Sequence, residues 1–459
     1  MDSLYRDIQH SIVHKYCTNT CTYHFYIMTY DNVYTCIRSL KTNNSDSVDK
    51  LMSQCLLHNS ELFALYVHLL FRSMLYHGFS PTCFLKATMI PIIKNKRGDS
   101  QNSDNYRAIA LSNLLGKVLD RLILQSQKIT FTLSDLQFGY KSNSSTTMCT
   151  SMLLETMNYY MSTKSEIYVV FIDASKAFDR VSHDQLFSLL LHRAVCPSIV
   201  RLLFIMYCNS SMSVRWGEAI SSMFSVQNGV RQGGVLSPVL YNIYTDNLLM
   251  QLKKSGFGCY IKHTFSGALG YADDLVLLSP SLYGMRVMIS ICERYAHDYK
   301  ILFNPNKSKL LCCNVKDTSM VKITLCGKPV EIVDSVQYLG NYVSRDICDR
   351  NIESVIQDFW YKHNCMRANF NMLNSYTLNK LHSTYCMNIY GSELFNYNSK
   401  YVNKLYVAWR KAMRQLFNIY YRTHNYIVFG LSGNIETRLH RKLARFIFTL
   451  LNSDKNICI

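Results

Sequence analysis

Three aspartates in this 459-residue chain stand where carboxylates commonly do chemistry. Asp173 directly follows the apolar run Ile167–Ile172, and Asp273 and Asp274 lie side by side within the stretch ALGYADDLVLLS. Carboxylates can hold hard cations such as Mg²⁺, which prefer oxygen ligands. Two such ions about 3.5–4 Å apart can activate an attacking hydroxyl and stabilise a leaving oxygen in phosphoryl transfer. The structural alternative is that these residues only cap a helix or form a turn.

Two elements would position these aspartates. The run Ile167–Ile172 is rich in β-branched and aromatic residues, which predicts a strand buried on both faces. Ser182 and Gln185 have capping-box spacing and predict the start of the next helix, so Asp173 is not needed as its cap. The apolar runs on both sides of the adjacent aspartate pair predict a β-hairpin that carries both acids at its tip.

The sequence FIDASKAFD, which begins at Phe171, and YADD, which begins at Tyr271, together resemble the palm of reverse transcriptases. Within that class, the chain is similar to the enzymes of non-LTR (LINE-like) retrotransposons. Further blocks of that family occur in the expected order at residues 90–94, 105–111, 136–140 with 144–147, 229–238, 304–309 and 338–340. The resemblance covers residues 85–345 strongly and extends more weakly to both ends.

This resemblance implies an RNA-directed DNA polymerase, a nucleotidyltransferase that extends a DNA primer on an RNA template with deoxynucleoside triphosphates. It implies two Mg²⁺ ions, for which Mn²⁺ can substitute, held by Asp173, Asp273 and Asp274. Lys307 matches a family lysine near the departing pyrophosphate, where it would donate a proton. Its alternative is an ordinary surface lysine.

The resemblance also implies a set of nucleotide contacts. Lys94 and Arg107 match fingers residues that hold triphosphate or nucleic-acid backbone, and each could instead be a solvated surface charge. Phe178 matches the steric gate that excludes a 2′-hydroxyl, although a purely structural core role is the alternative. Gln232 matches the residue that holds the incoming nucleotide against the template base, and Tyr271 completes the set.

The implied fold is α+β, a right-hand polymerase with fingers, a palm built on a small antiparallel sheet, and a helical thumb. We expect a mostly helical N-terminal extension at 1–84, fingers and palm at 85–345, and a basic helical thumb with a post-polymerase region at 346–459. Apolar spacing predicts a helix at 61–75. Ser237-Pro238 predicts the start of another helix.

The charge balance predicts a polyanionic partner. Lys and Arg number 49 against 31 Asp and Glu, which gives +18, and residues 401–459 alone carry ten cations against two acids. Two helices are expected there, one at 401–421 with Leu405, Val407, Ala408, Met413 and Leu416 on a packed face. The alternative is two solvated helix faces. The expected nucleic-acid contacts are Arg410, Lys411, Arg414, Arg441 and Lys442.

No apolar run approaches the ~18 residues that span a bilayer, and the N-terminus has no signal-peptide pattern. The expected location is therefore intracellular, in the nucleus and cytoplasm, with no membrane partner. The 17 cysteines, none with C-x-x-C spacing, predict reduced thiols. His14, Cys17, Cys21 and His24 are suitable zinc ligands, but their spacing matches no standard module, and core packing is the alternative.

Other functions remain open at this point. One alternative is a maturase-like or RNA-templating polymerase, against which the 105–111 and 338–340 blocks favour the retrotransposon branch. Another is a decayed or domesticated copy that binds nucleic acid without catalysis, although all three carboxylates are intact. Relatives commonly carry an endonuclease ahead of the polymerase, and about 80 residues are too few for one.

Overall fold

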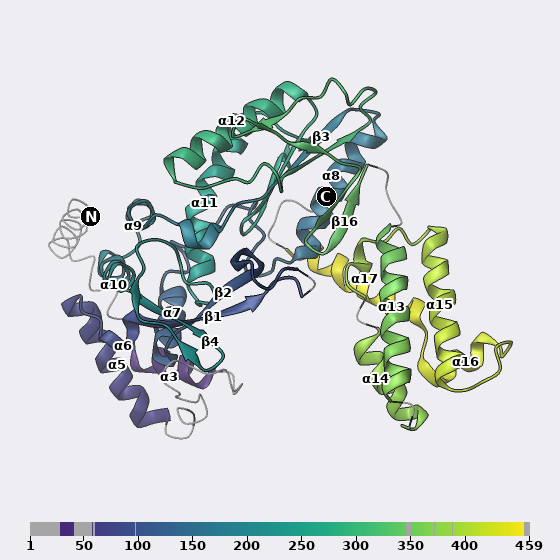
Figure 1. Ribbon diagram of the computed structural model, residues 1–459, viewed down its shortest axis with the longest axis horizontal. Coiled ribbons are helices and arrows are strands. Elements are labelled where there is room, and N and C mark those ends of the chain that lie inside the picture. Colours follow the sequence, from purple (N-terminus) through teal and green to yellow (C-terminus); the bar gives the residue numbers. More distant parts are fainter. Residues whose placement is uncertain are drawn as a thin grey trace. The chain divides into compact units, whose positions relative to one another are not determined.

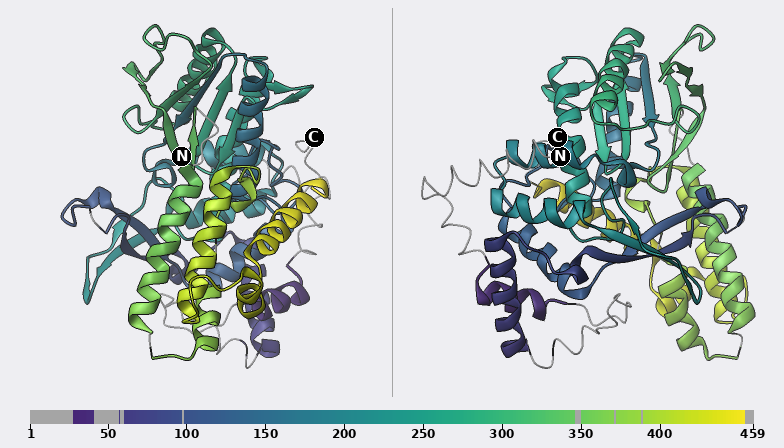
Figure 2. Two further views of the ribbon diagram at one scale, coloured as in Figure 1. Left: turned by 90° about the vertical axis from the view of Figure 1, so that its right-hand side faces the viewer. Right: turned by 60° about the vertical axis from the view of Figure 1, so that its left-hand side comes forward.

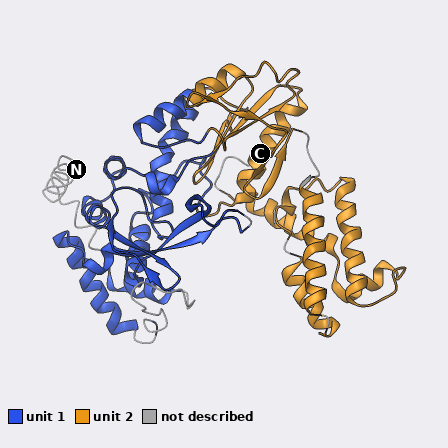
Figure 3. Cartoon of the chain, in the orientation of Figure 1, with its two compact units in different colours: residues 1–140, 173–254, 290–304 blue, residues 141–172, 255–289, 305–459 orange. Residues whose placement is uncertain are grey.

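The computed structural model describes residues 28–40, 57, 60–96, 98–345, 350–370, 372–387 and 389–453. These residues form helices and several small sheets, which confirms the predicted α+β class (Figure 1). Two compact units interleave along the sequence (Figure 3). The first comprises residues 1–140, 173–254 and 290–304, and the second comprises 141–172, 255–289 and 305–459. The His14, Cys17, Cys21 and His24 cluster lies outside the described residues.

The first unit contains a sheet with the strand order β2-β1-β4-β5, in which β6 also pairs with β4. The central strand β1 runs antiparallel to β2 and parallel to β4. The loop between β1 and β2 is closed by Asn105, whose side-chain amide donates to the carbonyls of Asn95 and Asp99. The strands are β1 (Lys86–Ile93), β2 (Tyr106–Leu111), β4 (Ser211–Trp216), β5 (Ala219–Ile220) and β6 (Phe224–Ser225).

Helices supply most of the core of the first unit. The predicted helix at 61–75 is confirmed as α5, which buries Ala64, Val67, Phe71 and Met74 on one face. That face joins a cluster built from several other helices. These elements are α3 (Tyr30–Arg38), α5 (Ser60–His77), α6 (Thr82–Leu85), η1 (Ser103–Asn105), α7 (Leu114–Ser126), η2 (Ala177–Arg180), α9 (His183–His192), α10 (Pro197–Cys208) and α11 (Ser237–Lys254).

The start of α9 agrees with the sequence, but its cap does not. The helix begins at His183, directly after Ser182, yet the Ser182 side chain makes no capping bond. Ser182 is buried, and its backbone amide instead donates a hydrogen bond to the hydroxyl oxygen of Tyr244 at 3.3 Å. The predicted capping box is therefore wrong in its contacts, because a tertiary partner occupies the position.

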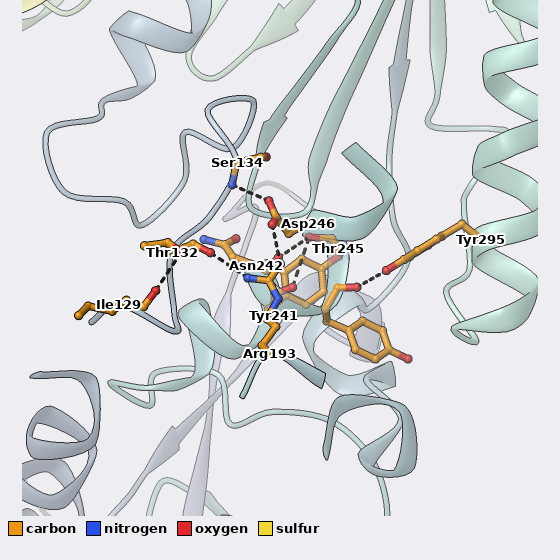
Figure 4. A network of polar contacts seen from close by, with 10 residues as sticks. Ile129, Thr132, Ser134, Arg193, Tyr241, Asn242, Thr245, Asp246 and Tyr295 are labelled. Carbon is orange, nitrogen blue, oxygen red and sulfur yellow. Dashed lines mark hydrogen bonds and ion pairs between the residues drawn. The ribbon is translucent and has the colours of Figure 1, made fainter. Parts of the chain in front are cut away.

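A polar network anchors α11 to the loop that precedes α8 (Figure 4). The Asp246 carboxylate accepts hydrogen bonds from the Ser134 amide at 2.9 Å and from Arg193 Nη2 at 2.6 Å. Asn242 Nδ2 donates to the carbonyl of Gly139 at 2.7 Å. The Asp246 and Arg193 side chains are only 6% and 18% exposed, so a largely desolvated ion pair fixes the helix.

The second unit contains a sheet with the strand order β14-β11-β3-β10-β9. Its pairings are antiparallel, as predicted, except that β14 runs parallel to β11. The central strand β3 is buried at all six positions, which confirms the two-sided burial expected of its apolar run. Helix α8 (Thr146–Ser162) packs against β3 and β9. The strands are β3 (Ile167–Ile172), β9 (Ala268–Tyr271), β10 (Asp274–Ser279), β11 (Lys309–Cys313) and β14 (Glu331–Ile332).

Helix α12 (Leu282–Asp298) begins in the second unit and ends in the first. Three short hairpins complete the strands of the second unit. The hairpins are β7 (Tyr260–Ile261) with β8 (Thr264–Phe265), β12 (Thr324–Leu325) with β13 (Lys328–Pro329), and β15 (Ser335–Tyr338) with β16 (Asn341–Ser344). None of the described helices is long and apolar enough to span a bilayer. The cysteines within the described ranges are free thiols, as predicted, and most are buried.

The described residues from 350 to 453 are mainly helical, as predicted, and their helices pack side by side (Figure 2). They share a core of their own, centred on Trp409 and Leu405. We call this part of the second unit, residues 350–453, the C-terminal bundle. Its elements are α13 (Arg350–Asn369), α14 (Ser375–Tyr385), η3 (Ser392–Leu394), α15 (Lys400–Leu416), α16 (Asn425–Ser432) and α17 (Ile435–Leu451).

Two details of the predicted 401–421 helix are wrong. Helix α15 ends at Leu416, because Asn418 takes a left-handed φ of 50° that terminates the helix. Val407 was expected on the packed face but is 42% exposed, whereas Leu405, Ala408, Met413 and Leu416 are buried. Position 407 lies about 200° around the helix from 405, so the two cannot share a face.

Candidate active site

The hairpin predicted around the adjacent aspartates is present in the second unit. Strand β9 pairs antiparallel with β10, and Tyr271 lies opposite Asp274. Ala272 and Asp273 form the connecting turn, in which Ala272 adopts a left-handed φ of 56° that costs about 1 kcal/mol. Asp273 is exposed and Asp274 is half-buried, so one carboxylate lies in the turn and the other on the first strand position.

Asp173 directly follows β3, the strand next to β10. The two strands are antiparallel, and their register places Ile172 opposite Leu275. One position beyond this pair, the chain reaches Asp173 on one side and Asp274 on the other. The backbone register therefore brings both residues to the same end of neighbouring strands.

Lys307 lies in an exposed turn between two segments that both pair with the end of β3. Before the turn, the Asn304 amide donates to the carbonyl of Asp173 at 2.8 Å. After it, Lys309 of β11 lies opposite Phe171. The backbone thus holds Lys307 within a few residues of these two pairings.

Tyr338 lies beside the same hairpin, although the sequence analysis did not assign it to the site. Its ring packs on Phe171, with 5.4 Å between ring centroids, and its hydroxyl lies 3.4 Å from Cys149 Sγ. Burial raises the pKa of Tyr338 well above its ordinary value, and Cys149, Asp274 and Tyr271 act in the same direction. Tyr338 therefore stays neutral at physiological pH. Its motif was visible in the sequence, but its contacts depend on the tertiary structure.

Gln232 is held at both its backbone and its side chain in the first unit. Its carbonyl accepts a hydrogen bond from the Ala110 amide of β2 at 2.7 Å, and its side-chain amide donates to Asp179 Oδ1 at 2.9 Å. The next residue, Gly233, has a φ of 95°, and a Cβ there would lie 3.2 Å from Ile109 Cγ2. Glycine is therefore required for the loop to approach β2 so closely.

A second set of polar contacts holds the base of this loop. Arg231 Nη2 donates to the carbonyl of Phe84 at 3.2 Å. Burial raises the pKa of Asp120 to about 6, although Arg231 and hydrogen bonds from the amides of Leu236 and Val235 lower it. Asp120 of α7 therefore accepts bonds from the segment that leads from Gln232 into α11.

Phe178 is half-buried and packs one face of its ring on Tyr241 of α11. The ring centroids are 4.8 Å apart and the planes are 16° from parallel. Its carbonyl accepts a hydrogen bond from the Val230 amide at 2.8 Å. The ring is thus supported from one side by the helix that follows the Gln232 loop.

The two predicted fingers cations lie near each other in the first unit's sheet but differ in their contacts. Lys94 Nζ donates to the carbonyl of Asp104 at 2.9 Å. The Asp104 carboxylate also pairs with Lys176 at 3.2 Å, which links the β1–β2 loop to the turn after Asp173. Arg107 is exposed on β2, opposite Ile92.

Asp179 is a site residue that the sequence analysis missed. Burial raises the pKa of its carboxyl, whereas the Gln232 amide and the cations Lys176, Lys94 and Arg180 lower it. The Asp179 carboxylate therefore interacts electrostatically with three basic side chains of the first unit. The signal was available, because Asp179 directly follows Phe178 in the motif FIDASKAFD, but its partner is 53 residues away in sequence.

Three of the five predicted nucleic-acid contacts have partners inside the C-terminal bundle. Arg410 pairs with Glu436 at 3.2 Å. Arg414 donates through Nε and Nη2 to the carbonyl of Thr423, and Lys442 Nζ donates to the carbonyl of Ile389 at 2.7 Å. Lys411 and Arg441, the other two, are exposed on α15 and α17.

The predicted metal ligands provide the correct donor type for a hard cation. Asp173, Asp273 and Asp274 supply carboxylate oxygens, the ligands that Mg²⁺ and Mn²⁺ prefer. Among the residues that the structure describes, no group of three or more His, Cys, Asp or Glu side chains is already arranged to hold a metal ion. The fit therefore rests on the donor chemistry and on the β3–β10 register.

Comparison with known proteins identifies the family. Residues 93–343, more than half of the chain, match the family described as reverse transcriptase (RNA-dependent DNA polymerase). The chain belongs to the reverse transcriptase family. Membership confirms the resemblance that the motifs carried.

Its similar relatives come from non-LTR retrotransposons. The RNA-directed DNA polymerase from mobile element jockey of Drosophila funebris is 26% identical over 352 residues, which cover 72% of this chain and 37% of the relative. A Pol polyprotein from the R2 element of Popillia japonica is 31% identical, covering 44% of this chain and 28% of the relative. The probable RNA-directed DNA polymerase from transposon BS of Drosophila melanogaster is 25% identical, covering 88% of this chain and 46% of the relative. The chain thus spans less than half the length of each of these relatives.

Telomerases are among the solved structures with partial similarity. Apo telomerase from Candida tropicalis gives a TM-score of 0.38 at 14% identity, covering 61% of this chain and 60% of that one. Telomerase from Candida albicans with a fragment of telomeric RNA gives a TM-score of 0.44 at 10% identity, covering 80% of this chain and 70% of that one.

Proposed function

We propose that this chain is the polymerase portion of a non-LTR retrotransposon protein and copies RNA into DNA by nucleotidyl transfer. The observation that carries the proposal is the register of β3 and β10, which brings Asp173 and Asp274 to the same end of adjacent strands. Family membership supplies the reaction class. The proposed partners are an RNA template, a DNA primer and deoxynucleoside triphosphates, and the proposed location is the nucleus and cytoplasm.

We assign the parts of the polymerase to the residue ranges expected from the sequence. Residues 85–345 would provide fingers and palm, residues 346–459 the thumb and the region after it, and 1–84 an N-terminal extension. Asp173, Asp273 and Asp274 would hold two Mg²⁺ ions, with Mn²⁺ as a substitute. When bound, these ions would activate the primer 3′-hydroxyl and stabilise the leaving pyrophosphate.

The other residues would bind, orient and protonate. Lys94 and Arg107 would hold triphosphate oxygens, to which the guanidinium fork of Arg107 is suited. Gln232 and Tyr271 would position the nucleotide, and Phe178 would lie beneath its sugar. Lys307, exposed in its turn, would give a proton to the pyrophosphate. These steps need positioning and charge neutralisation more than covalent chemistry.

The test is extension of a DNA primer on an RNA template, with Mg²⁺ present or removed by a chelator. We expect extension only with the metal. Asp173→Ala and Asp273→Ala should each lower the rate by at least about a thousandfold, because a lost metal ligand removes transition-state stabilisation. Asp274→Ala should have a less complete effect, since by resemblance it is the less direct ligand.

Folding should survive these changes, because the backbone hydrogen bond from the Asn304 amide to the carbonyl of residue 173 is kept in the Asp173 variant. The control is Asp298→Ala, which removes an exposed acid at the end of α12. It should extend primers at the wild-type rate. An Asp173 variant with near wild-type extension would refute the site, and template binding without any extension would favour the non-catalytic alternative.

A further inference from the structure

The segment that carries Gln232 lies along the segment that carries Asp179. The Gly229 amide donates to the carbonyl of Val181, and the Val230 amide donates to the carbonyl of Phe178, both at 2.8 Å. Gly229 has a φ of 94°, and a Cβ there would lie only 2.9 Å from the Cα of Asp179. Only glycine permits this approach, so the backbone of Asp179 has a fixed distance from the loop.

The side chains of this pair then restrict each other. Gln232 Nε2 donates to Asp179 Oδ1 at 2.9 Å, while the carbonyl of Gln232 is held by the Ala110 amide. An ionised carboxylate can only accept hydrogen bonds, so it selects one of the two orientations of the amide. Nε2 faces Asp179, and Oε1 is left on the other side of the amide as an acceptor.

Several neighbouring groups support the ionised form of Asp179. Burial raises the pKa of its carboxyl, whereas the Gln232 amide and the cations Lys176, Lys94 and Arg180 act against that rise. Lys176 also pairs with Asp104 at 3.2 Å, in an ion pair whose two side chains are both largely exposed. A hydrogen bond to a charged acceptor is stronger than one between neutral groups, which makes the orientation of the amide correspondingly firm.

We propose that Asp179 is a positioning residue for the incoming nucleotide, which acts by fixing the side-chain amide of Gln232 with Oε1 directed away from it. This inference rests on the nucleotide-binding role proposed for Gln232. Asp179 does not touch the nucleotide in this arrangement. Its contribution is to remove the alternative amide orientation before the nucleotide binds, which lowers the entropic cost of binding.

The decisive variant is Asp179→Asn. It keeps the size of the side chain and can still accept a hydrogen bond, but its amide can also donate, so both orientations of Gln232 become available. We expect the KM for the deoxynucleotide to rise about tenfold, with kcat within about twofold, in single-nucleotide incorporation on an RNA template. Asp179→Ala should give a similar or larger rise.

A double-mutant cycle separates positioning from a general structural effect. Gln232→Ala alone should raise KM about tenfold or more, and adding Asp179→Asn to it should cause no further rise. A matched control is Asp184→Asn, an exposed acid five residues along the chain in the first turn of α9. It should leave KM unchanged, and thermal unfolding should confirm that all variants are folded.

The possible failures are distinguishable. If Gln232→Ala leaves KM unchanged while the protein still extends primers, the nucleotide role of Gln232 is wrong and the positioning role of Asp179 is overturned with it. If Gln232→Ala raises KM but Asp179→Asn matches wild type, only the positioning inference is overturned. Additive effects of the two substitutions overturn it as well, because Asp179 would then act independently of Gln232.

Discussion

At the scale of single residues, Phe178 combines a structural contact with a proposed selective one. Its ring packs on Tyr241 with centroids 4.8 Å apart, and it is half-buried. Its position five residues after Asp173 matches the steric gate of the family. Packing and selection make different demands on the ring, so substitutions can separate them.

We expect Phe178→Val to admit ribonucleotides. The smaller side chain keeps part of the contact with Tyr241 but opens space below the sugar, so the preference for deoxynucleotides should fall about tenfold or more. Phe178→Ala should act in the same direction at a greater cost in stability. The measurement is the ratio of kcat/KM for deoxy- and ribonucleotides.

The control for this prediction is Tyr241→Phe, which preserves the stacked ring under Phe178 and should leave the ratio unchanged. Reduced stability with an unchanged ratio in Phe178→Val would show that the residue only packs.

At the scale of elements, the C-terminal bundle contains a buried histidine pair. His363 of α13 and His382 of α14 are 0% and 1% exposed, and their ring centroids are 5.4 Å apart. Burial lowers the pKa of His382 to about 3, and His363 and Arg438 act in the same direction. Burial also lowers the pKa of His363, which Gln415 opposes and Arg367 reinforces. Both histidines are therefore neutral in the folded bundle.

Acid should unfold this bundle through the pair. A histidine with a lowered folded pKa binds its proton more readily when unfolded, so its stabilising effect is complete above about pH 6.5 and is lost as pH falls below it. The free energy of unfolding should fall by up to about 1.4 kcal/mol per pH unit for each histidine. Urea unfolding at pH 4–8, followed by fluorescence of Trp360 and Trp409, measures this.

His382→Leu should flatten the acid limb of that profile, because the substituted side chain has no proton to bind. His297, an exposed histidine near the end of α12, gives the matched control. His297→Gln should keep the wild-type profile. An acid limb that persists unchanged in His382→Leu would assign the pH dependence to other groups.

At the scale of the whole molecule, the net charge of +18 indicates a polyanionic partner, and family membership makes nucleic acid the natural one. The cations of the C-terminal bundle are not equivalent in this respect. Three of them donate hydrogen bonds to partners within the bundle, namely Arg410, Arg414 and Lys442. Lys411 and Arg441, by contrast, are exposed. We therefore propose that Lys411 and Arg441 provide the main phosphate contacts of this set.

The double variant Lys411→Gln with Arg441→Gln should weaken binding of an RNA–DNA duplex for all sequences alike. The slope of log affinity against log salt should fall by about one unit for each lost phosphate contact. The matched comparison is Arg410→Gln with Arg414→Gln, which should chiefly lower the stability of the bundle. Equal salt slopes in wild type and the Lys411–Arg441 variant would place the nucleic acid elsewhere.

Local elements and motifs could be predicted from the sequence alone. The six apolar residues before Asp173 predicted a strand buried on both faces, and the apolar runs on both sides of Asp273 predicted a hairpin, because these features depend on neighbours in the chain. The α+β class and the family followed from the order of the motifs. The ends of elements were less certain, as Asn418 shows by ending α15 five residues before the predicted position.

Contacts between side chains that are distant in sequence could not be predicted in this way. Asp179 and Gln232 are 53 residues apart, and nothing near either one predicts their hydrogen bond. Ser182 had the spacing of a helix cap, but burial gave its amide a different partner. Arg414 was predicted to contact nucleic acid, because it lies in a basic segment. Two of its nitrogens instead donate hydrogen bonds to the backbone carbonyl of Thr423. Such contacts depend on how distant segments pack, and a long polar side chain takes whichever partner that packing brings within reach.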